Sequence, residues 1–238
     1  MRTLSLETKI HGRVLVDDPI TLPSVALVVV FHGYAQSAED ALAEVRKIPG
    51  ASAWTIASVQ GLHRFYNRNS EKVIASWMTR QDRDDAIADN VAYVDRAIDA
   101  VGVPGPIVFV GFSQGASMAY RAAVRGSHRE VGVIALGGDI PPEVKTGELL
   151  RPWPAVLIGG GEGDTWFTPA KAQADAAFLA AQQVPHDVVR FAGGHEWTDE
   201  FRASAARWLQ RVIQAAATSR ASSTDRPCGS GRFGRTSE

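Results

Sequence analysis

The sequence predicts a doubly wound α/β domain, in which a mostly parallel sheet carries helices on both faces. Short apolar runs rich in β-branched residues alternate along the chain with segments long enough to form helices. Strands that are apolar throughout are typical of parallel sheets that are buried on both sides. The strand–helix alternation favours the same arrangement. Ligands of such sheets bind beyond the carboxyl ends of the strands, so the loops that follow strands are where we expect chemistry.

The predicted elements follow in order from the N-terminus. Residues 3–16 are interpreted as one or two edge strands, and residues 25–31, VALVVVF, form the longest strongly apolar run. Further strands are predicted at residues 54–59, 107–111, 131–136, 155–158 and 188–191. Helices are predicted at residues 38–47, 84–101, 114–125, 169–183 and 199–217. The helix at 84–101 is the clearest, because its apolar residues recur at spacings of three and four and form one stripe.

We expect one domain, residues 1–217, followed by a disordered tail, residues 218–238. The 238 residues are 45% hydrophobic and 21% charged, which suits a single globular domain with a sizeable core. From Thr218 onward the chain is rich in Ser, Arg and Gly and has few aliphatic residues. Such a segment buries too little apolar surface to offset its ordering entropy. Its arginines are either simply solvated or in contact with an acidic partner.

Charge and cysteine content exclude several classes of protein. A net charge of −1 argues against a nucleic-acid partner held by phosphate contacts. The apolar run at residues 25–31 is too short to span a membrane, and the first ten residues lack the apolar stretch of a secretory signal. The single cysteine, Cys228, allows no intrachain disulfide, which fits a cytoplasmic location. No cluster of His and Cys has metal-binding spacing, so we expect no metal or organic cofactor.

A candidate nucleophile follows the predicted strand at residues 107–111. The chain continues as Gly111-Phe-Ser113-Gln-Gly115 and enters a predicted helix directly. A serine on a sharp strand-to-helix turn needs neighbours without a Cβ two residues to either side, and the two glycines meet that need. The turn exposes the hydroxyl and places the N–H of Gln114, at the helix N-terminus, where an oxyanion would form. The other interpretation of Ser113 is a helix N-cap after a tight turn.

The base predicted to activate Ser113 is His195. It lies in Gly193-Gly-His195-Glu-Trp197, after the last predicted strand and before the last predicted helix. The two preceding glycines let this loop bring the imidazole over the elbow. The other five of the six histidines fall in strands, at helix ends or in loops that suit structural roles better.

The acid that orients His195 is expected between the serine and the histidine, because triads built on a serine at a strand-to-helix elbow follow the order Ser, Asp, His. Asp164 follows the predicted strand at residues 155–158 and is favoured, since the penultimate strand usually carries this acid. Asp139, after the preceding strand, and Glu162 remain alternatives. A turn residue after glycines is the structural interpretation of Asp164.

A second oxyanion donor is predicted after the run at residues 25–31. This run leads into His32-Gly33-Tyr34, and a His-Gly pair at this point belongs to the oxyanion loop of the fold. Gly33 permits a sharp turn, and the N–H of Tyr34 would face the substrate carbonyl. We interpret His32 as a buried, hydrogen-bonded residue that supports the loop.

Together these segments resemble the phospholipase/carboxylesterase family of small α/β-hydrolases, over roughly residues 23–215. The matching pieces are FHGY, ASWM, GFSQGASMA, GEGDTWFTP and GGHEW, in this order. The resemblance implies a Ser113–His195–Asp164 triad, with the N–H groups of Tyr34 and Gln114 as the oxyanion hole. Trp77, in ASWM, matches a tryptophan near the active site of relatives, and small esterases of this kind often form homodimers.

The predicted reaction is cleavage of a carboxylic ester or thioester through an acyl-enzyme, with a small molecule as the substrate partner. This sequence departs from its relatives in bulky residues near the site, which favours a short or compact acyl group. We name four candidate pocket residues: Tyr66, Trp77, Trp166 and Phe167. Lysophospholipase, acyl-protein thioesterase, peptidase or other acyl-transfer activities are alternatives on the same triad. A non-catalytic small-molecule sensor is the alternative of another class.

Overall fold

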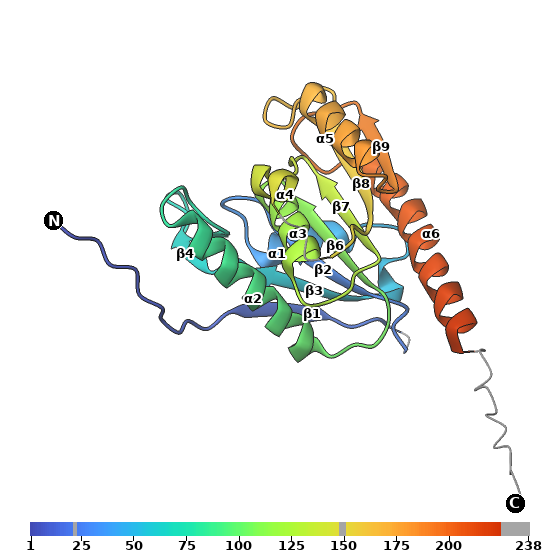
Figure 1. Cartoon of the computed structure of the whole chain (residues 1–238), viewed down its shortest axis with the longest axis horizontal. Helices are drawn as coiled ribbons and strands as arrows, with labels where there is room; N and C mark the ends of the chain where they lie inside the picture. The colour runs from blue at the N-terminus through green and yellow to red at the C-terminus, as the bar shows by residue number, and fades with distance from the viewer. Residues whose placement is uncertain (21–22, 148–150, 225–238) are drawn as a thin grey trace, which may run out of the picture.

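The computed structural model describes residues 1–20, 23–147 and 151–224 of the chain. A seven-stranded sheet lies at its centre, with the strand order β1-β3-β2-β6-β7-β8-β9 (Figure 1). The strands of this sheet are β1 (Arg13–Asp17), β2 (Leu27–Phe31), β3 (Thr55–Gln60), β6 (Ile107–Phe112), β7 (Gly132–Leu136), β8 (Ala155–Gly161) and β9 (His186–Phe191). All neighbours pair in parallel except β1, which runs antiparallel to β3 at the edge of the sheet. The predicted mostly parallel, doubly wound sheet is confirmed.

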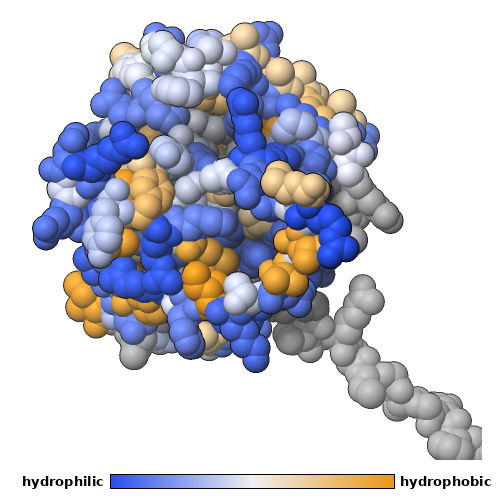
Figure 2. Space-filling view, turned by 90° about the vertical axis from the view of Figure 1, so that its left-hand side faces the viewer, coloured by the Kyte–Doolittle hydropathy of each residue, from blue (hydrophilic) through white to orange (hydrophobic). Residues whose placement is uncertain are grey.

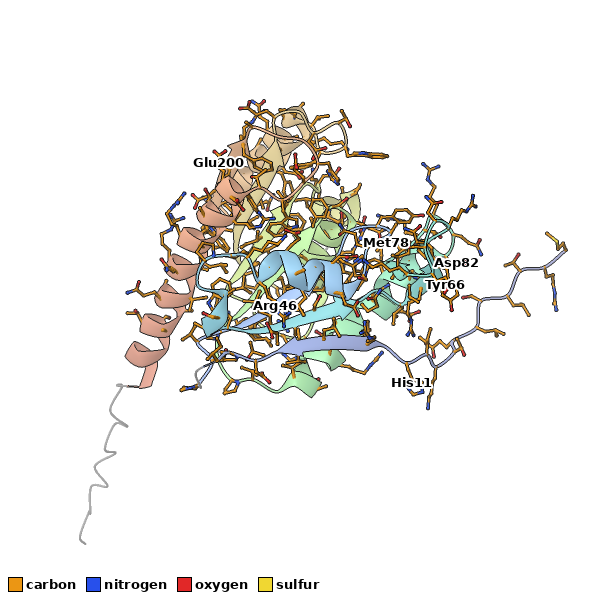
Figure 3. All side chains as sticks on the ribbon, turned by 180° about the vertical axis from the view of Figure 1, so that it is seen from behind. His11, Arg46, Tyr66, Met78, Asp82 and Glu200 are labelled. Carbon is orange, nitrogen blue, oxygen red and sulfur yellow. The ribbon has the colours of Figure 1, made fainter. Side chains whose placement is uncertain are left out.

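Helices cover both faces of this sheet. They are α1 (Ala38–Val45), α2 (Arg83–Val101), α3 (Gln114–Arg125), α4 (Pro142–Thr146), α5 (Pro169–Ala181) and α6 (Asp199–Thr224), with a short 3-10 helix at Ala51–Ala53. Helices α2, α3 and α5 pack on one face, and α1 and α6 pack on the other, which Figure 3 shows from behind. Alternate residues of β2 point into the two resulting cores: Val29 into the first and Val28 into the second. This two-sided burial is the reason that β2 is apolar at every position.

Three differences from the sequence prediction concern the ends of the chain and one insertion. Residues 1–12 form no regular strand, and only β1 pairs with the sheet, so the predicted edge structure is shorter than residues 3–16. Helix α6 continues to Thr224, past the predicted domain boundary at residue 217. The rest of the predicted tail, residues 225–238, lies outside the described residues. A hairpin of β4 (His63–Tyr66) and β5 (Val73–Ser76), which the sequence did not predict, stands beside the sheet.

Candidate functional site

Ser113 lies on a sharp turn between β6 and α3. β6 ends at Phe112 and α3 begins at Gln114, so Ser113 alone links the strand to the helix. Its φ of 55° and ψ of −120° lie outside the regions that L-residues normally occupy. Its N–H donates to the carbonyl oxygen of Leu136 at 2.8 Å, which ties the turn to β7. The strained backbone is the sharp strand-to-helix turn that the G-x-S-x-G pattern predicts.

The two glycines of this pattern are required by close packing. A Cβ on Gly111 would lie 2.2 Å from the carbonyl oxygen of Gly115. A Cβ on Gly115 would lie 2.1 Å from the carbonyl oxygen of Phe31, at the end of β2. Neither position can hold a larger residue unless the backbone moves. The turn is therefore pressed against the neighbouring strand β2 as well as against its own helix.

His195 contacts both Ser113 and Asp164. It lies in the loop between β9 and α6, and its Nε2 is 2.8 Å from Oγ of Ser113. Its Nδ1 is 2.7 Å from Oδ2 of Asp164. An ionised carboxylate can only accept a hydrogen bond, so Nδ1 carries the proton and Nε2 is left to accept from the serine hydroxyl. The ring also packs against Phe112, with 4.9 Å between the ring centroids.

Asp164 is the acid that the structure brings to His195. It follows β8 and is only 3% exposed. Its Oδ1 accepts hydrogen bonds from the N–H groups of Trp166 at 2.8 Å and Phe167 at 2.9 Å. Burial alone would raise the pKa of Asp164, but the hydrogen bond from His195 and these two backbone bonds outweigh it and hold the pKa below its usual value. The carboxylate is therefore ionised at neutral pH.

The two alternative acids do not contact the histidine. Asp139 is exposed, and its carboxylate lies 3.8 Å from the ammonium of Lys171. Glu162 is also exposed, at the start of the turn that carries Asp164. Of the three acids that the sequence offered, Asp164 is thus the one whose geometry suits a triad.

The loop after β2 is held by side chains and by β5. The N–H of Gly33 donates to Oε1 of Gln36 at 2.7 Å, and the N–H of Ala35 donates to the carbonyl oxygen of Ala75 at 3.0 Å. Because Phe31 pairs with Gly111 in the parallel register of β2 and β6, Tyr34 and Gln114 lie equally far beyond the ends of neighbouring strands. The two N–H groups predicted as oxyanion donors therefore start from adjacent loops at one edge of the sheet.

His32 supports this loop from within. It is fully buried, and the N–H of Gly61 donates to its Nε2 at 2.9 Å. The proton is consequently on Nδ1, which donates to the carbonyl oxygen of Gly33 at 2.7 Å. Burial lowers the pKa of His32 and outweighs the opposing effect of this hydrogen bond, so the ring stays neutral. The structural role assigned to His32 from the sequence agrees with these contacts.

The four candidate pocket residues divide into two pairs. Trp77 and Phe167 are fully buried or nearly so, which corrects their prediction as pocket-lining residues. Trp77 stacks on His32, and Phe167 lies in the core beneath the loop of Asp164. In contrast, Trp166 is 75% exposed and Tyr66 is 72% exposed. Only this second pair has surface with which to touch a substrate.

The hairpin adds aromatic residues to the surface beside the loop after β2. Phe65, on β4, packs against Tyr34 with 6.0 Å between ring centroids, so the hairpin contacts the loop after β2. Residues 66–71 and 73 line a hollow of about 840 Å³. On the side of the molecule where the hairpin lies, hydrophobic residues form separate patches among hydrophilic ones (Figure 2). Tyr66 and Met78 lie toward the same end of the molecule (Figure 3).

Sequence reasoning missed several residues that shape the site. Gln36 caps Gly33, the side chain of Gln114 binds the backbone after β5, and Phe112 packs against His195. A glutamine three residues after a loop glycine, and an aromatic residue before the serine, were the available indications. In the described ranges, no group of three or more His, Cys, Asp or Glu side chains is placed to hold a metal ion. No helix in those ranges is both long and apolar enough to cross a membrane.

Comparison with known proteins agrees with this architecture. Esterase PE8 is 20% identical with a TM-score of 0.68, and the match covers 85% of this chain and 100% of that one. The Bacillus cereus carboxylesterase is 18% identical with a TM-score of 0.67, over 84% of this chain and 94% of that one. Zea mays acyl-protein thioesterase 2 is 16% identical with a TM-score of 0.68, over 85% and 100%. These likenesses establish the α/β-hydrolase fold.

The family follows from the sequence itself. The profile of the Phospholipase/Carboxylesterase family matches residues 18–213, which is most of the chain. A search of curated protein sequences finds no significant match. The chain belongs to the phospholipase/carboxylesterase family of α/β-hydrolases, and the resemblance found in its motifs is confirmed.

Proposed function

We propose that the protein is a serine hydrolase that cleaves carboxylic esters or thioesters through an acyl-enzyme. Oγ of Ser113 attacks the carbonyl carbon while Nε2 of His195 takes the hydroxyl proton. Asp164 keeps the imidazole in the required tautomer and stabilises the imidazolium that forms. The N–H groups of Tyr34 and Gln114 hold the oxyanion of the tetrahedral intermediate.

In the remaining steps His195 acts first as an acid and then again as a base. The imidazolium of His195 gives its proton to the departing alcohol or thiol, which leaves the acyl group on Ser113. His195 then takes a proton from water as the water attacks the acyl carbonyl. The imidazolium returns this proton to Oγ of Ser113 as the bond between Oγ and the acyl carbon breaks, so the acid is released and the serine hydroxyl is restored. No other proton carrier is needed for this cycle.

One observation carries the proposal: Oγ of Ser113, the imidazole of His195 and the carboxylate of Asp164 form a continuous relay at 2.8 Å and 2.7 Å. These distances lie within the range expected of a nucleophile and its base. The three side chains lie in the loops after β6, β8 and β9. They meet because these strands are parallel and their carboxyl ends lie at the same edge of the sheet. A relay of this kind at a strained elbow suits nucleophilic catalysis far better than a structural role.

We propose a narrower substrate class than the family alone implies. The exposed rings of Tyr34 and Trp166 stand on the loops after β2 and β8, from which the proposed oxyanion donor and triad acid also come. We infer that they leave room for a short or compact acyl group. Lysophospholipase and acyl-protein thioesterase activities, which need long acyl chains, are the second candidates. Cytoplasmic location and homodimer formation stay predictions of the sequence.

Fluorophosphonate labelling, together with hydrolysis of p-nitrophenyl esters of increasing chain length, tests the proposal. We expect labelling of the wild-type protein, its loss in Ser113→Ala, and turnover that falls by a factor on the order of 10⁶ in this variant. A maximum at short chains would support the compact acyl pocket, and a maximum at long chains would favour the second candidates. Folded wild-type protein that takes no label would contradict the proposal and favour the small-molecule sensor.

A further inference from the structure

The side-chain amide of Gln114 binds the backbone just after the hairpin. Its Oε1 accepts from the N–H of Trp77 at 2.9 Å, and its Nε2 donates to the carbonyl oxygen of Met78 at 3.0 Å. Ser76 Oγ lies 3.2 Å from the same Oε1 and 2.8 Å from the carbonyl oxygen of Met78. Both ends of one amide are thus used to fix residues 76–78 to the first turn of α3.

Trp77 continues the connection to the other side of the site. Its indole N–H donates to the carbonyl oxygen of His32 at 2.9 Å, and its ring stacks on the imidazole with 5.1 Å between centroids. The carbonyl oxygen of Trp77 accepts from Asn90 at 2.7 Å, which anchors the segment on α2. Residues 76–78 therefore join the start of α3 to the end of β2.

This connection spans the two groups that would hold the oxyanion. Gln114 supplies one N–H from its own backbone, and His32 precedes Tyr34, the source of the other, by only two residues. Trp77 is fully buried, so a lost indole bond would leave the carbonyl oxygen of His32 without a replacement from water. Little else can approach that oxygen, because a Cβ on Gly115 would already lie 2.6 Å from it.

We propose that Gln114 and Trp77, through their side chains, are positioning residues that fix the two oxyanion donors relative to each other. This inference rests on the proposed function and adds to it two side chains that do not touch the substrate. Each acts at a distance: Gln114 orients the helix start that carries its own N–H, and Trp77 orients the carbonyl before the loop of Tyr34. Oxyanion donors stabilise the transition state only when they are held in place before the reaction.

The test cuts the connection at each end and leaves both donors in the chain. Gln114→Met removes both amide bonds but keeps the backbone N–H and much of the side-chain volume. Trp77→Phe removes the indole donor but keeps a ring against His32. Trp208→Phe is the matched control, because Trp208 is as deeply buried but packs beside Gly132, at the opposite end of the sheet.

We expect each site variant to lower kcat by about 10- to 100-fold, which is less than loss of a donor outright, with KM changed little. Affinity for a trifluoromethyl ketone, whose adduct with Ser113 carries an oxyanion, should fall by the same factor. The double variant should lose little more than the worse single variant, because both cut one connection. Trp208→Phe should keep kcat and ketone affinity.

Several outcomes would overturn the inference. Folded site variants with wild-type kcat and ketone affinity would do so, as would independent, fully multiplicative losses in the double variant. A loss no larger than the decrease in folded fraction, measured by urea unfolding, would show a merely structural role. Should one site variant fail to fold, the other and Ser76→Ala decide the question by the same readouts. Fluorophosphonate labelling of the wild type separates these outcomes from failure of the proposed function, in which no label is taken up at all.

Discussion

Two buried carboxyl groups, one at each end of the sheet, show opposite behaviour. Asp164, beyond the carboxyl end of β8, accepts three hydrogen bonds, and its pKa is lowered. Glu130, just before the amino end of β7, is 7% exposed, and its Oε2 has no hydrogen-bond partner among the described residues. Burial raises the pKa of Glu130 to about 7, although a hydrogen bond from its own backbone N–H and the charges of Arg151 and Arg129 oppose the rise.

The comparison of Asp164 with Glu130 shows that burial alone does not determine the charge of a carboxyl group. Both side chains are removed from water, which disfavours a negative charge. Only Asp164 has hydrogen-bond donors around it that stabilise the ionised carboxylate against this effect. Glu130 borders a hollow of about 440 Å³ whose wall includes Trp153, and the indole nitrogen of Trp153 also lacks a partner within the described part of the chain. Polar groups at the proposed site are hydrogen-bonded before any substrate arrives, whereas Oε2 of Glu130 and the indole nitrogen of Trp153 at the far end have no partner among the described residues.

The largest expected effect comes from removing the charge of Asp164. Asp164→Asn should lower turnover by about 10⁴-fold, because an amide no longer selects the tautomer of His195 that accepts from Ser113. Asp139→Asn is the matched control and should keep wild-type turnover, since Asp139 lies beside Lys171 and not beside His195. Ester hydrolysis by both purified variants measures the difference. Comparable losses of turnover in the two variants would contradict the assignment of Asp164 as the acid that orients His195.

A smaller loss is expected when the imidazole is displaced. Gly137 has a φ of 65°, and a Cβ there would lie 3.0 Å from Cε1 of His195. Gly102 has nearly the same φ, 63°, but the nearest atom to its Cβ would be 3.6 Å away, at the end of α2. Both alanine variants should be destabilised by about 1 kcal/mol. Only Gly137→Ala should also lower kcat, by about 10- to 100-fold.

Measurement of kcat alongside thermal unfolding distinguishes backbone strain from contact with the histidine. Equal kcat in the two glycine variants would mean that His195 tolerates the added methyl group. Because Gly137 and Gly102 have nearly the same φ, the backbone strain of the two alanine variants should be similar, and a difference in kcat reports the contact with His195.

The smallest effect concerns Glu130 and depends on pH. An unfolded Glu loses its proton near pH 4.3, and the folded one near pH 7. Between these values the folded state binds more protons than the unfolded state, so this residue makes stability fall as pH rises toward 7. Glu130→Gln should therefore raise the free energy of unfolding by about 1–3 kcal/mol at pH 9 and by little at pH 4.

Urea unfolding at the two pH values, with ester hydrolysis as a second readout, tests this expectation. Turnover should not change, because Glu130 is at the opposite end of the sheet from the relay. A gain that is the same at both pH values would show that packing, and not charge, limits stability at this position.

Much of the fold could be predicted because its strands are buried on both faces. The runs at β2, β6 and β7 are apolar at nearly every position, and the helices between them fall within a few residues of their predicted bounds. The β4–β5 hairpin escaped prediction because β4 is exposed and mixed in character, and the buried part of β5, from Ile74 to Ser76, is too short to mark a strand. Residues 1–12 lack a partner strand, and an edge pattern alone does not form a strand.

The site was predictable where backbone demands a particular residue, and unpredictable where side chains from distant elements meet. Gly111, Gly115 and the order of Ser113, Asp164 and His195 follow from the elbow and the fold. The burial of Trp77 and Phe167 could not be read from the sequence, because an aromatic residue in a loop suits a pocket or a core equally well. The two hydrogen bonds of the Gln114 amide, to the backbone of Trp77 and Met78, depend on the position of the segment after β5, which the sequence did not predict.

The separation of Ser113, Asp164 and His195 along the chain has a consequence for when the relay between them can form. Ser113 and His195 are 82 positions apart in the sequence, yet Nε2 of His195 lies only 2.8 Å from Oγ of Ser113. Contacts between such distant positions close large loops, and loop closure slows folding. Helices and local turns can form before β6, β7, β8 and β9 have aligned, but the relay cannot. Under the proposed function, a nascent or refolding chain therefore gains activity only after its last strand has joined the sheet.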